Sequence, residues 1–138
     1  MSLIGGNIHF LPRKLFSWSK NITRLNLSEN KLRTLDCLHH LPNVKTIDVQ
    51  FNELDDSFFM DIAGFKLNQV KSLNVSHNNM ESFESVTRIL YQNRELQKLD
   101  LRYCKKSLKL SNVLLVKKVF FENEKSLQIK ACNLILAI

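Results

Sequence analysis

Residues 22–32 read ITRLNLSENKL, and the same order of apolar and polar residues returns along the chain. The later copies are VKTIDVQFNEL at 44–54, VKSLNVSHNNM at 70–80 and LQKLDLRYC at 96–104. A weaker fifth copy, LQIKACNL at 127–134, follows Glu124, which stands where the first apolar residue is expected. Self-similarity of this kind predicts a repeat architecture in which each unit stacks on its neighbours.

Each copy contains a short segment in which apolar and polar residues alternate. In the first copy, Leu25 and Leu27 alternate with Arg24, Asn26 and Ser28. A period of two predicts a half-buried strand, with the leucines pointing inward and the polar residues outward.

The chain has to turn after each strand, and that turn leaves backbone groups without a ladder partner. A buried side chain at one fixed position can satisfy them, and stacked repeats then form a ladder of such side chains. A cysteine fits the same volume but offers only a weak S–H donor. The predicted ladder residues are Asn30, Asn52, Asn78, Cys104 and Cys132.

The spacing L-x-x-L-x-L-x-x-N/C-x-L over residues 22–134 resembles the leucine-rich repeat family. The mixture of repeat lengths is similar to that of the intracellular members. The resemblance implies an α/β fold, a right-handed horseshoe-shaped solenoid with short parallel strands on the concave face and helices or 3₁₀ turns on the convex face. It also implies a scaffold that binds another protein on the concave face, with no catalytic activity and no cofactor.

The distance between ladder residues is 22, 26, 26 and 28 residues in turn. The short interval leaves room for a 3₁₀ turn near Asp36–His40, and the longer ones predict α-helices over 55–66, 81–93 and 107–120. We expect one array over 1–138. It consists of a partial repeat at 1–20, repeats near 22–43, 44–69, 70–95 and 96–123, and a partial or degenerate repeat at 124–138.

Both ends of the array look incomplete. Gly6 lies near the ladder position of an earlier repeat, whose strand would fall on Met1–Ile4, and residues 131–138 read ACNLILAI without a polar cap. Solenoids need polar-faced terminal repeats for solubility. One interpretation is a fragment of a larger protein, which could carry a catalytic domain elsewhere. The alternative is self-association through the uncapped ends.

The outward strand positions predict the partner-binding surface, because equivalent positions stack across the repeats. The predicted binding residues on this concave face are Arg24, Asn26, Asp48, Gln50, Phe51, Asn74, His77, Lys98, Asp100, Arg102 and Tyr103. In the last repeat the same columns would continue through Ser126, Gln128 and Lys130.

Phe51, His77 and Tyr103 occupy the position just before the ladder residue, so we expect them side by side at the edge of the concave face. Exposed aromatic residues next to Arg102 and Lys98 have the composition of an interface hot spot. The alternative is that these rings only pack over the repeat edges and shield the backbone.

The net charge of +7 is uneven: residues 1–93 hold 10 Lys and Arg against 9 Asp and Glu, whereas residues 94–138 hold 10 against 4. The simplest interpretation is a solvated face. The alternatives are a patch for an acidic protein partner, for RNA or for an anionic membrane surface. An RNA-associated adaptor would use this basic third, most of all Lys105, Lys106, Lys109, Lys117 and Lys118, and its binding would depend steeply on salt.

The chain has three cysteines and three N-x-S/T sequons, which help to decide whether the protein is intracellular or secreted. Reduced ladder cysteines are favoured over a Cys104–Cys132 bridge. The sequons at Asn26 and Asn74 fall on predicted strands, where a glycan would block the concave face. We therefore expect an intracellular protein, cytoplasmic or nuclear, without a transmembrane segment. A fragment of a receptor ectodomain, glycosylated at Asn21, is the alternative.

Candidates for catalysis or metal binding are sparse. His39 and His40 lie near Cys37 in a predicted turn, a spacing that matches no zinc pattern. His77 beside Ser76 would need an orienting carboxylate and an oxyanion hole to form a triad. Asp48 and Asp100 lie on neighbouring strands, but the strand alternation places polar residues there in any case. We expect no metal and no enzyme.

Overall fold

The computed structural model describes most of the first four repeats and two strands near the C-terminus. The described residues are 1–16, 19–61, 69–82, 84, 90, 93, 95–104, 128–131 and 134–137. Within them no helix is long and apolar enough to cross a membrane.

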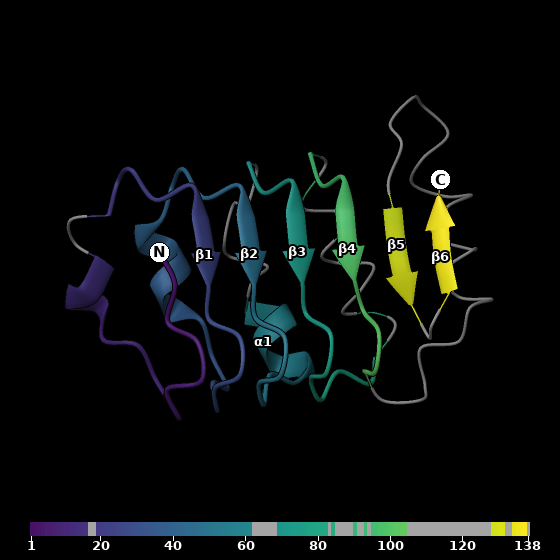
Figure 1. Ribbon diagram of the computed structural model, residues 1–138, viewed down its shortest axis with the longest axis horizontal. Coiled ribbons are helices and arrows are strands. Elements are labelled where there is room, and N and C mark those ends of the chain that lie inside the picture. Colours follow the sequence, from purple (N-terminus) through teal and green to yellow (C-terminus); the bar gives the residue numbers. More distant parts are fainter. Residues whose placement is uncertain are drawn as a thin grey trace.

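The strands lie side by side along the long axis of the molecule (Figure 1). They form one sheet in sequence order, β1-β2-β3-β4-β5-β6. The strands are β1 (Arg24–Asn26), β2 (Thr46–Asp48), β3 (Ser72–Asn74), β4 (Lys98–Asp100), β5 (Gln128–Ala131) and β6 (Leu134–Ala137). Neighbours from β1 to β5 are parallel, and β6 returns antiparallel to β5. Parallel neighbours need crossover connections, which the repeats supply.

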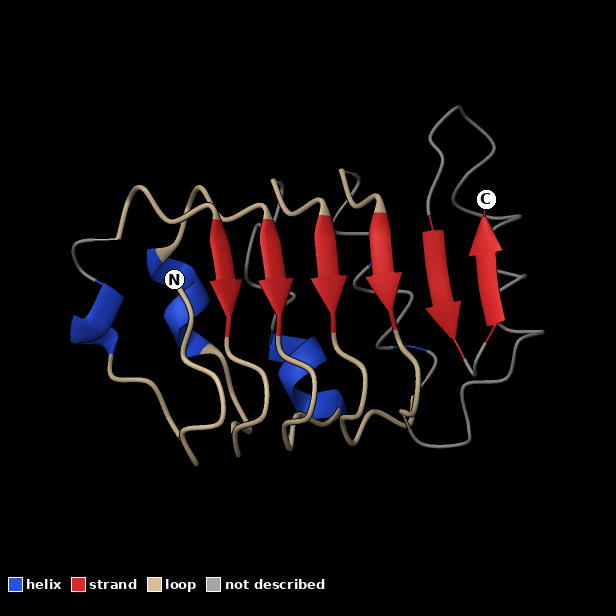
Figure 2. Cartoon of the chain, in the orientation of Figure 1, coloured by secondary structure: helices blue, strands red, loops and turns tan. Residues whose placement is uncertain are grey.

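The helical segments are short; the first precedes β1, and the other two lie in connections between strands (Figure 2). They are η1 (Arg13–Phe16), η2 (Asp36–His40) and α1 (Asp56–Asp61). The 3₁₀ turn predicted at Asp36–His40 is confirmed. The helix predicted over 55–66 is confirmed as far as Asp61, and residues 62–68 lie outside the described part. Most of the helix predicted over 81–93, and all of that over 107–120, also fall outside it.

Helix α1 begins where the sequence supplies a cap. Asp55 accepts hydrogen bonds from the backbone N–H of Ser57 and from its hydroxyl. The hydrogen bond from the Ser57 side chain is the main cause that lowers the pKa of Asp55 below its usual value. Such a cap satisfies a donor that the first helical turn leaves unpaired.

The core lies between the strands and their return segments, and the inward positions of the repeats fill it. Leu25, Ile47, Leu73 and Leu99 from the middle of strands β1 to β4 are at most 3% exposed. Phe58 of α1 and Leu38 of η2 are buried in the same cluster. The inward positions of the period-two prediction are therefore confirmed for these strands. The outward positions are confirmed only in part, because Ser28 is 3% and Asp100 is 9% exposed.

The ladder runs through the core beside the strands. Asn52 donates to the carbonyl oxygens of Leu27, in the preceding repeat, at 2.9 Å and of Val49 at 3.1 Å, and its Oδ1 accepts the N–H of Leu32 at 2.9 Å. Asn78 repeats the pattern one repeat later, with the carbonyl oxygens of Val49 and Val75 and the N–H of Leu54. The ladder prediction is confirmed for these residues.

The ladder also extends to both sides of these two asparagines. Asn30 donates to the carbonyl of Leu3 and accepts the N–H groups of Gly6 and Ile8, each at 3.0 Å. Cys104 donates through Sγ to the carbonyl of Val75 at 3.3 Å. Its thiol forms no disulfide bond. Cys132 lies outside the described residues.

The N-terminal segment pairs with β1 over a shorter stretch than the strand predicted at Met1–Ile4. It forms an isolated parallel bridge from Ser2 to Asn26. Gly6 lies close to the first ladder residue, because a Cβ there would stand 3.1 Å from the Ile8 side chain and 3.4 Å from Asn30 Oδ1. A side chain at position 6 would therefore crowd both neighbours.

The last part of the sheet departs from the prediction in two ways. The predicted columns align Ser126 with Lys98 and Gln128 with Asp100, but β5 pairs Gln128 with Lys98 and Lys130 with Asp100. The register is therefore shifted by two residues. The chain then reverses, and Ala131 pairs with Leu134 of β6. A fifth parallel strand is present, but an antiparallel strand follows it directly.

Candidate functional site

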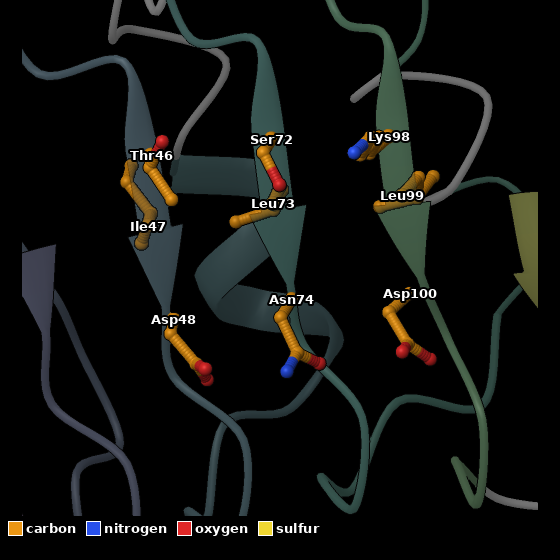
Figure 3. A pocket seen from close by; sticks show the side chains of 9 residues that line it. All are labelled: Thr46, Ile47, Asp48, Ser72, Leu73, Asn74, Lys98, Leu99 and Asp100. Carbon is orange, nitrogen blue, oxygen red and sulfur yellow. The ribbon is translucent and has the colours of Figure 1, made fainter. Parts of the chain in front are cut away.

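The concave face of β2, β3 and β4 carries two rows of polar side chains (Figure 3). The upper row is Thr46, Ser72 and Lys98, and the lower row is Asp48, Asn74 and Asp100. Inward-pointing Ile47, Leu73 and Leu99 separate the rows. Together these nine residues line a shallow hollow with a volume of about 260 Å³. The registers thus bring together four of the predicted binding residues, Asp48, Asn74, Lys98 and Asp100.

The lower row and the equivalent Asn26 of β1 also form hydrogen bonds within the chain that the sequence interpretation missed. Asn26, Asp48, Asn74 and Asp100 each accept, through Oδ1, the backbone N–H of the residue two positions later, at 3.0–3.2 Å. This is the Asx-turn geometry, which Asn and Asp favour. It explains why only these two residue types occupy the position. Their partner-binding role remains a prediction for the side-chain atoms that the turn leaves open.

Arg102 and Asp100 form a charge pair at the β4 end of the face. The guanidinium donates from Nε and from NH2 to both carboxylate oxygens, and the shortest contact is 2.8 Å. Hydrogen bonding to Asp100, followed by its charge, raises the pKa of Arg102 above its ordinary value. Because Asp100 is only 9% exposed, the pair also compensates a nearly buried carboxylate.

Arg24 and Gln50 complete the predicted set on neighbouring strands. Arg24 lies in β1, level with Thr46, and is exposed. Gln50 follows β2, and its Oε1 accepts a hydrogen bond from Asn74 Nδ2 at 3.2 Å. Gln50 therefore helps to join the second and third repeats.

The aromatic ridge (Phe51, His77 and Tyr103) follows the lower row at the end of the strands. The rings of Phe51 and His77 stack with centroids 3.9 Å apart and an interplanar angle of 16°. The rings of His77 and Tyr103 stack at 4.3 Å and 23°. The prediction that these residues lie side by side is confirmed. Phe51 remains 46% and Tyr103 56% exposed, so the stack leaves much of its surface in solvent.

The backbone of the ridge is left-handed, a feature that the sequence interpretation also missed. Phe51, His77 and Tyr103 have φ values of 53°, 55° and 56°. The equivalent residues one and two repeats before Phe51, Glu29 and Gly5, share this conformation with φ values of 59° and 65°. Non-glycine residues rarely adopt it, at a cost of about 1–2 kcal/mol each. Stacked rings return about 0.5–1.5 kcal/mol per pair. The stack therefore offsets part of the backbone strain and holds the rings rigidly.

The structure offers no metal centre within its described residues, where no group of three His, Cys, Asp or Glu side chains could hold an ion. His39 and His40 close the 3₁₀ turn η2 and are exposed. The basic residues proposed for RNA, Lys105, Lys106, Lys109, Lys117 and Lys118, lie outside the described part.

Comparisons with known proteins agree with this geometry. A family model described as leucine rich repeat matches residues 1–54. A search of curated proteins found no match. Among solved structures, the chain is similar to U2A′ in the crystal structure of the Drosophila melanogaster SNF/U2A′ complex. The match has a TM-score of 0.51 and 18% sequence identity, and it covers 89% of this chain and 81% of that chain.

The similarity to U2A′ bears on the fold alone, because so low an identity does not carry function. The repeats match in sequence over 1–54, the Asn and Cys ladder continues to Cys104, and the parallel sheet continues to β5. The chain therefore has the leucine-rich repeat fold, and its residues 1–54 match the leucine-rich repeat family.

Proposed function

We propose that the protein is a non-catalytic scaffold that binds a partner protein on its concave face and on the aromatic ridge. The observation that carries this proposal is the exposure of Phe51 and Tyr103. Burying these aromatic side chains against a partner would be favourable, because aromatic side chains are usually found at least partly buried. Aromatic residues and arginine are the residue types that contribute most at protein interfaces.

The rigidity of the ridge supports the proposal. Stacking fixes the side chains, and hydrogen bonds join the backbones, since the N–H of Phe51 donates to the carbonyl of Ser76 and that of His77 to the carbonyl of Arg102. A surface that is ordered before binding loses little conformational entropy when a partner arrives. The U2A′ structure is a complex with another protein, which is in line with the proposal.

The test is an affinity capture from cell extract with two matched variants. The first carries Phe51→Ala and Tyr103→Ala, and the second carries Phe10→Ala, which removes a 72% exposed aromatic ring away from the ridge. Arg102 stays unchanged, because its loss would leave the Asp100 carboxylate without its guanidinium partner. Circular dichroism checks that both variants keep their fold.

We expect a protein that the native chain and the Phe10→Ala variant recover and the ridge variant does not. If the native protein and both variants recover the same partner equally, the ridge only packs over the repeat edges. The main support for the proposal is then lost. Salt-sensitive recovery of unrelated RNAs would instead favour the RNA-associated adaptor.

An intracellular location remains a prediction, and the sequons offer a way to test it. Asn26 and Asn74 are engaged in turns on the concave face, whereas Asn21 is exposed. Expression in a secretory host followed by mass spectrometry would detect a glycan at Asn21. A glycan there, or a Cys104 disulfide, would favour the receptor ectodomain.

A further inference from the structure

The two rows on the concave face differ in charge from one end to the other. At the β4 end, Lys98 adds a positive charge beside the paired Asp100 and Arg102. In β3, Ser72 and Asn74 are neutral. At the β2 end, Asp48 adds a negative charge. The face is therefore positive over β4 and negative over β2.

Lys98 and Asp48 have no ion pair within the described part of the chain. Lys98 is exposed, and its side chain extends toward β3 in Figure 3. Asp48 uses Oδ1 for the N–H of Gln50, so Oδ2 is open to a partner. The two residues lie two strands and two residues apart, which places their Cα atoms about 12 Å from each other. They form no ion pair with each other, and a partner with the opposite charges could reach both.

The hydrogen bonding of the sheet limits what kind of segment can lie there. Strands β2, β3 and β4 are paired on both sides, so they offer no free edge to an added strand. An extended peptide across their face would have to bury main-chain groups without partners, which is costly. A helix satisfies its backbone internally and presents only side chains.

We propose that the hollow over β2–β4 receives an α-helix of the partner that carries an acidic residue over Lys98 and a basic residue over Asp48. Seven residues of helix rise about 10.5 Å and return to nearly the same side, which suits the spacing of the two charges. Between them, residues of the helix fill the hollow above Ser72. This inference rests on the proposed function, because it identifies the chemistry of the partner at the same face.

The experiment is a selection from a yeast-displayed library of single helices in which two positions seven residues apart vary over all amino acids. The folded protein is the bait, at low salt. A native bait should enrich one acidic and one basic residue at the varied positions. An exposed charge pair of this kind changes affinity by up to roughly fivefold. Raising the salt concentration should weaken the preference.

Two variant baits make the test specific for the two charges. Lys98→Glu reverses the charge at an exposed position, so the selected acidic residue should be replaced by a basic one. Asp48→Asn removes the charge but keeps the amide oxygen for the turn, as Asn26 and Asn74 do in their repeats. With that bait only the basic residue should lose its enrichment.

A bait carrying Phe51→Ala and Tyr103→Ala separates this inference from the proposed function. Two results would overturn the inference and leave the proposed function standing. In the first, the selected helices need the ridge but carry no acidic and basic residue at the varied positions. In the second, the same two charged residues are selected with every bait. If no helix is enriched, or if the enriched helices depend on neither the ridge nor the two charges, this inference fails, and the affinity capture alone decides the proposed function.

Discussion

The repeats closed by Asn78 and by Cys104 share a strand, a turn and a left-handed residue, but their ladder side chains differ in what they can bind. The Asn78 amide contacts three carbonyl oxygens and one N–H. The Cys104 thiol contacts the carbonyl of Val75 and carries no oxygen to accept the N–H of Met80, the position that corresponds to Leu32 and Leu54. Both repeats keep the same shape, so the shape does not depend on the full set of ladder contacts.

The difference indicates that the ladder supplies stability rather than topology. Side-chain burial and the register from β1 to β4 continue unchanged past Asn78 into β4. Beyond Cys104 the register shifts and the chain reverses at β6. We therefore expect the interfaces between neighbouring repeats to be least stable around the fourth repeat and most stable around the second and third.

The largest expected effect is the loss of a ladder asparagine. Asn78→Ala leaves the buried N–H of Leu54 and the carbonyl of Val49 without this partner, so the free energy of unfolding should fall by about 2–4 kcal/mol. Urea denaturation followed by circular dichroism measures it. Asn78→Cys should lose less, because a thiol still donates. If Cys104→Ala were as damaging as Asn78→Ala, the contrast between the two repeats would be wrong.

The aromatic ridge joins the two regions, so its middle ring offers the next test. His77→Ala removes both stacked pairs and should cost about 1–2 kcal/mol in the free energy of unfolding. The matched control is Glu29→Ala, which keeps the same left-handed backbone position at a residue without a stacked ring. Equal losses in thermal or urea unfolding would assign the effect to the backbone position instead of the stack.

Making the fourth repeat resemble the third should raise stability. Cys104→Asn supplies an amide that can reach the carbonyls used at Asn78 and an oxygen that can accept the N–H of Met80. We expect a gain of about 1 kcal/mol in the same urea assay. A lower unfolding midpoint would mean that the space around Cys104 is shaped for sulfur.

The smallest expected effect distinguishes the contribution of backbone strain from that of ring stacking to the free energy of unfolding, at the left-handed strand-end positions. Glu29→Gly relieves the backbone at φ 59° and should raise the free energy of unfolding by about 0.5 kcal/mol. Phe51→Gly relieves the same strain but loses a ring contact, so it should give no gain. A gain for both variants in parallel unfolding curves would show that the stack adds little stability.

Much of this arrangement could be predicted from the sequence, because a strand exposes every second residue and the repeats set the spacing. The ladder at Asn30, Asn52 and Asn78 and the ridge follow from that pattern alone. The Asx turns could also have been found, since Asn26 and the three lower-row residues are all Asn or Asp. That chemical restriction was the available signal.

Two features could not be found in the same way. The left-handed strand-end position carries a glycine only at Gly5, and the later repeats place Glu29, Phe51, His77 and Tyr103 there, so no glycine marks the turn in those repeats. The shift at β5 is two residues, and a shift of two keeps every side chain on its own face. Alternation of apolar and polar residues is the same in both registers, and only the contacts with β4 decide between them.

The ladder also sets the order in which its hydrogen bonds can form during synthesis. Each ladder side chain from Asn30 to Cys104 reaches back to the preceding repeat. On a ribosome, which releases the N-terminus first, the N–H of Leu32 must wait for Asn52, and that of Leu54 must wait for Asn78. The hydrogen bonds of each newly synthesised repeat are thus completed only when the ladder residue of the next repeat has emerged.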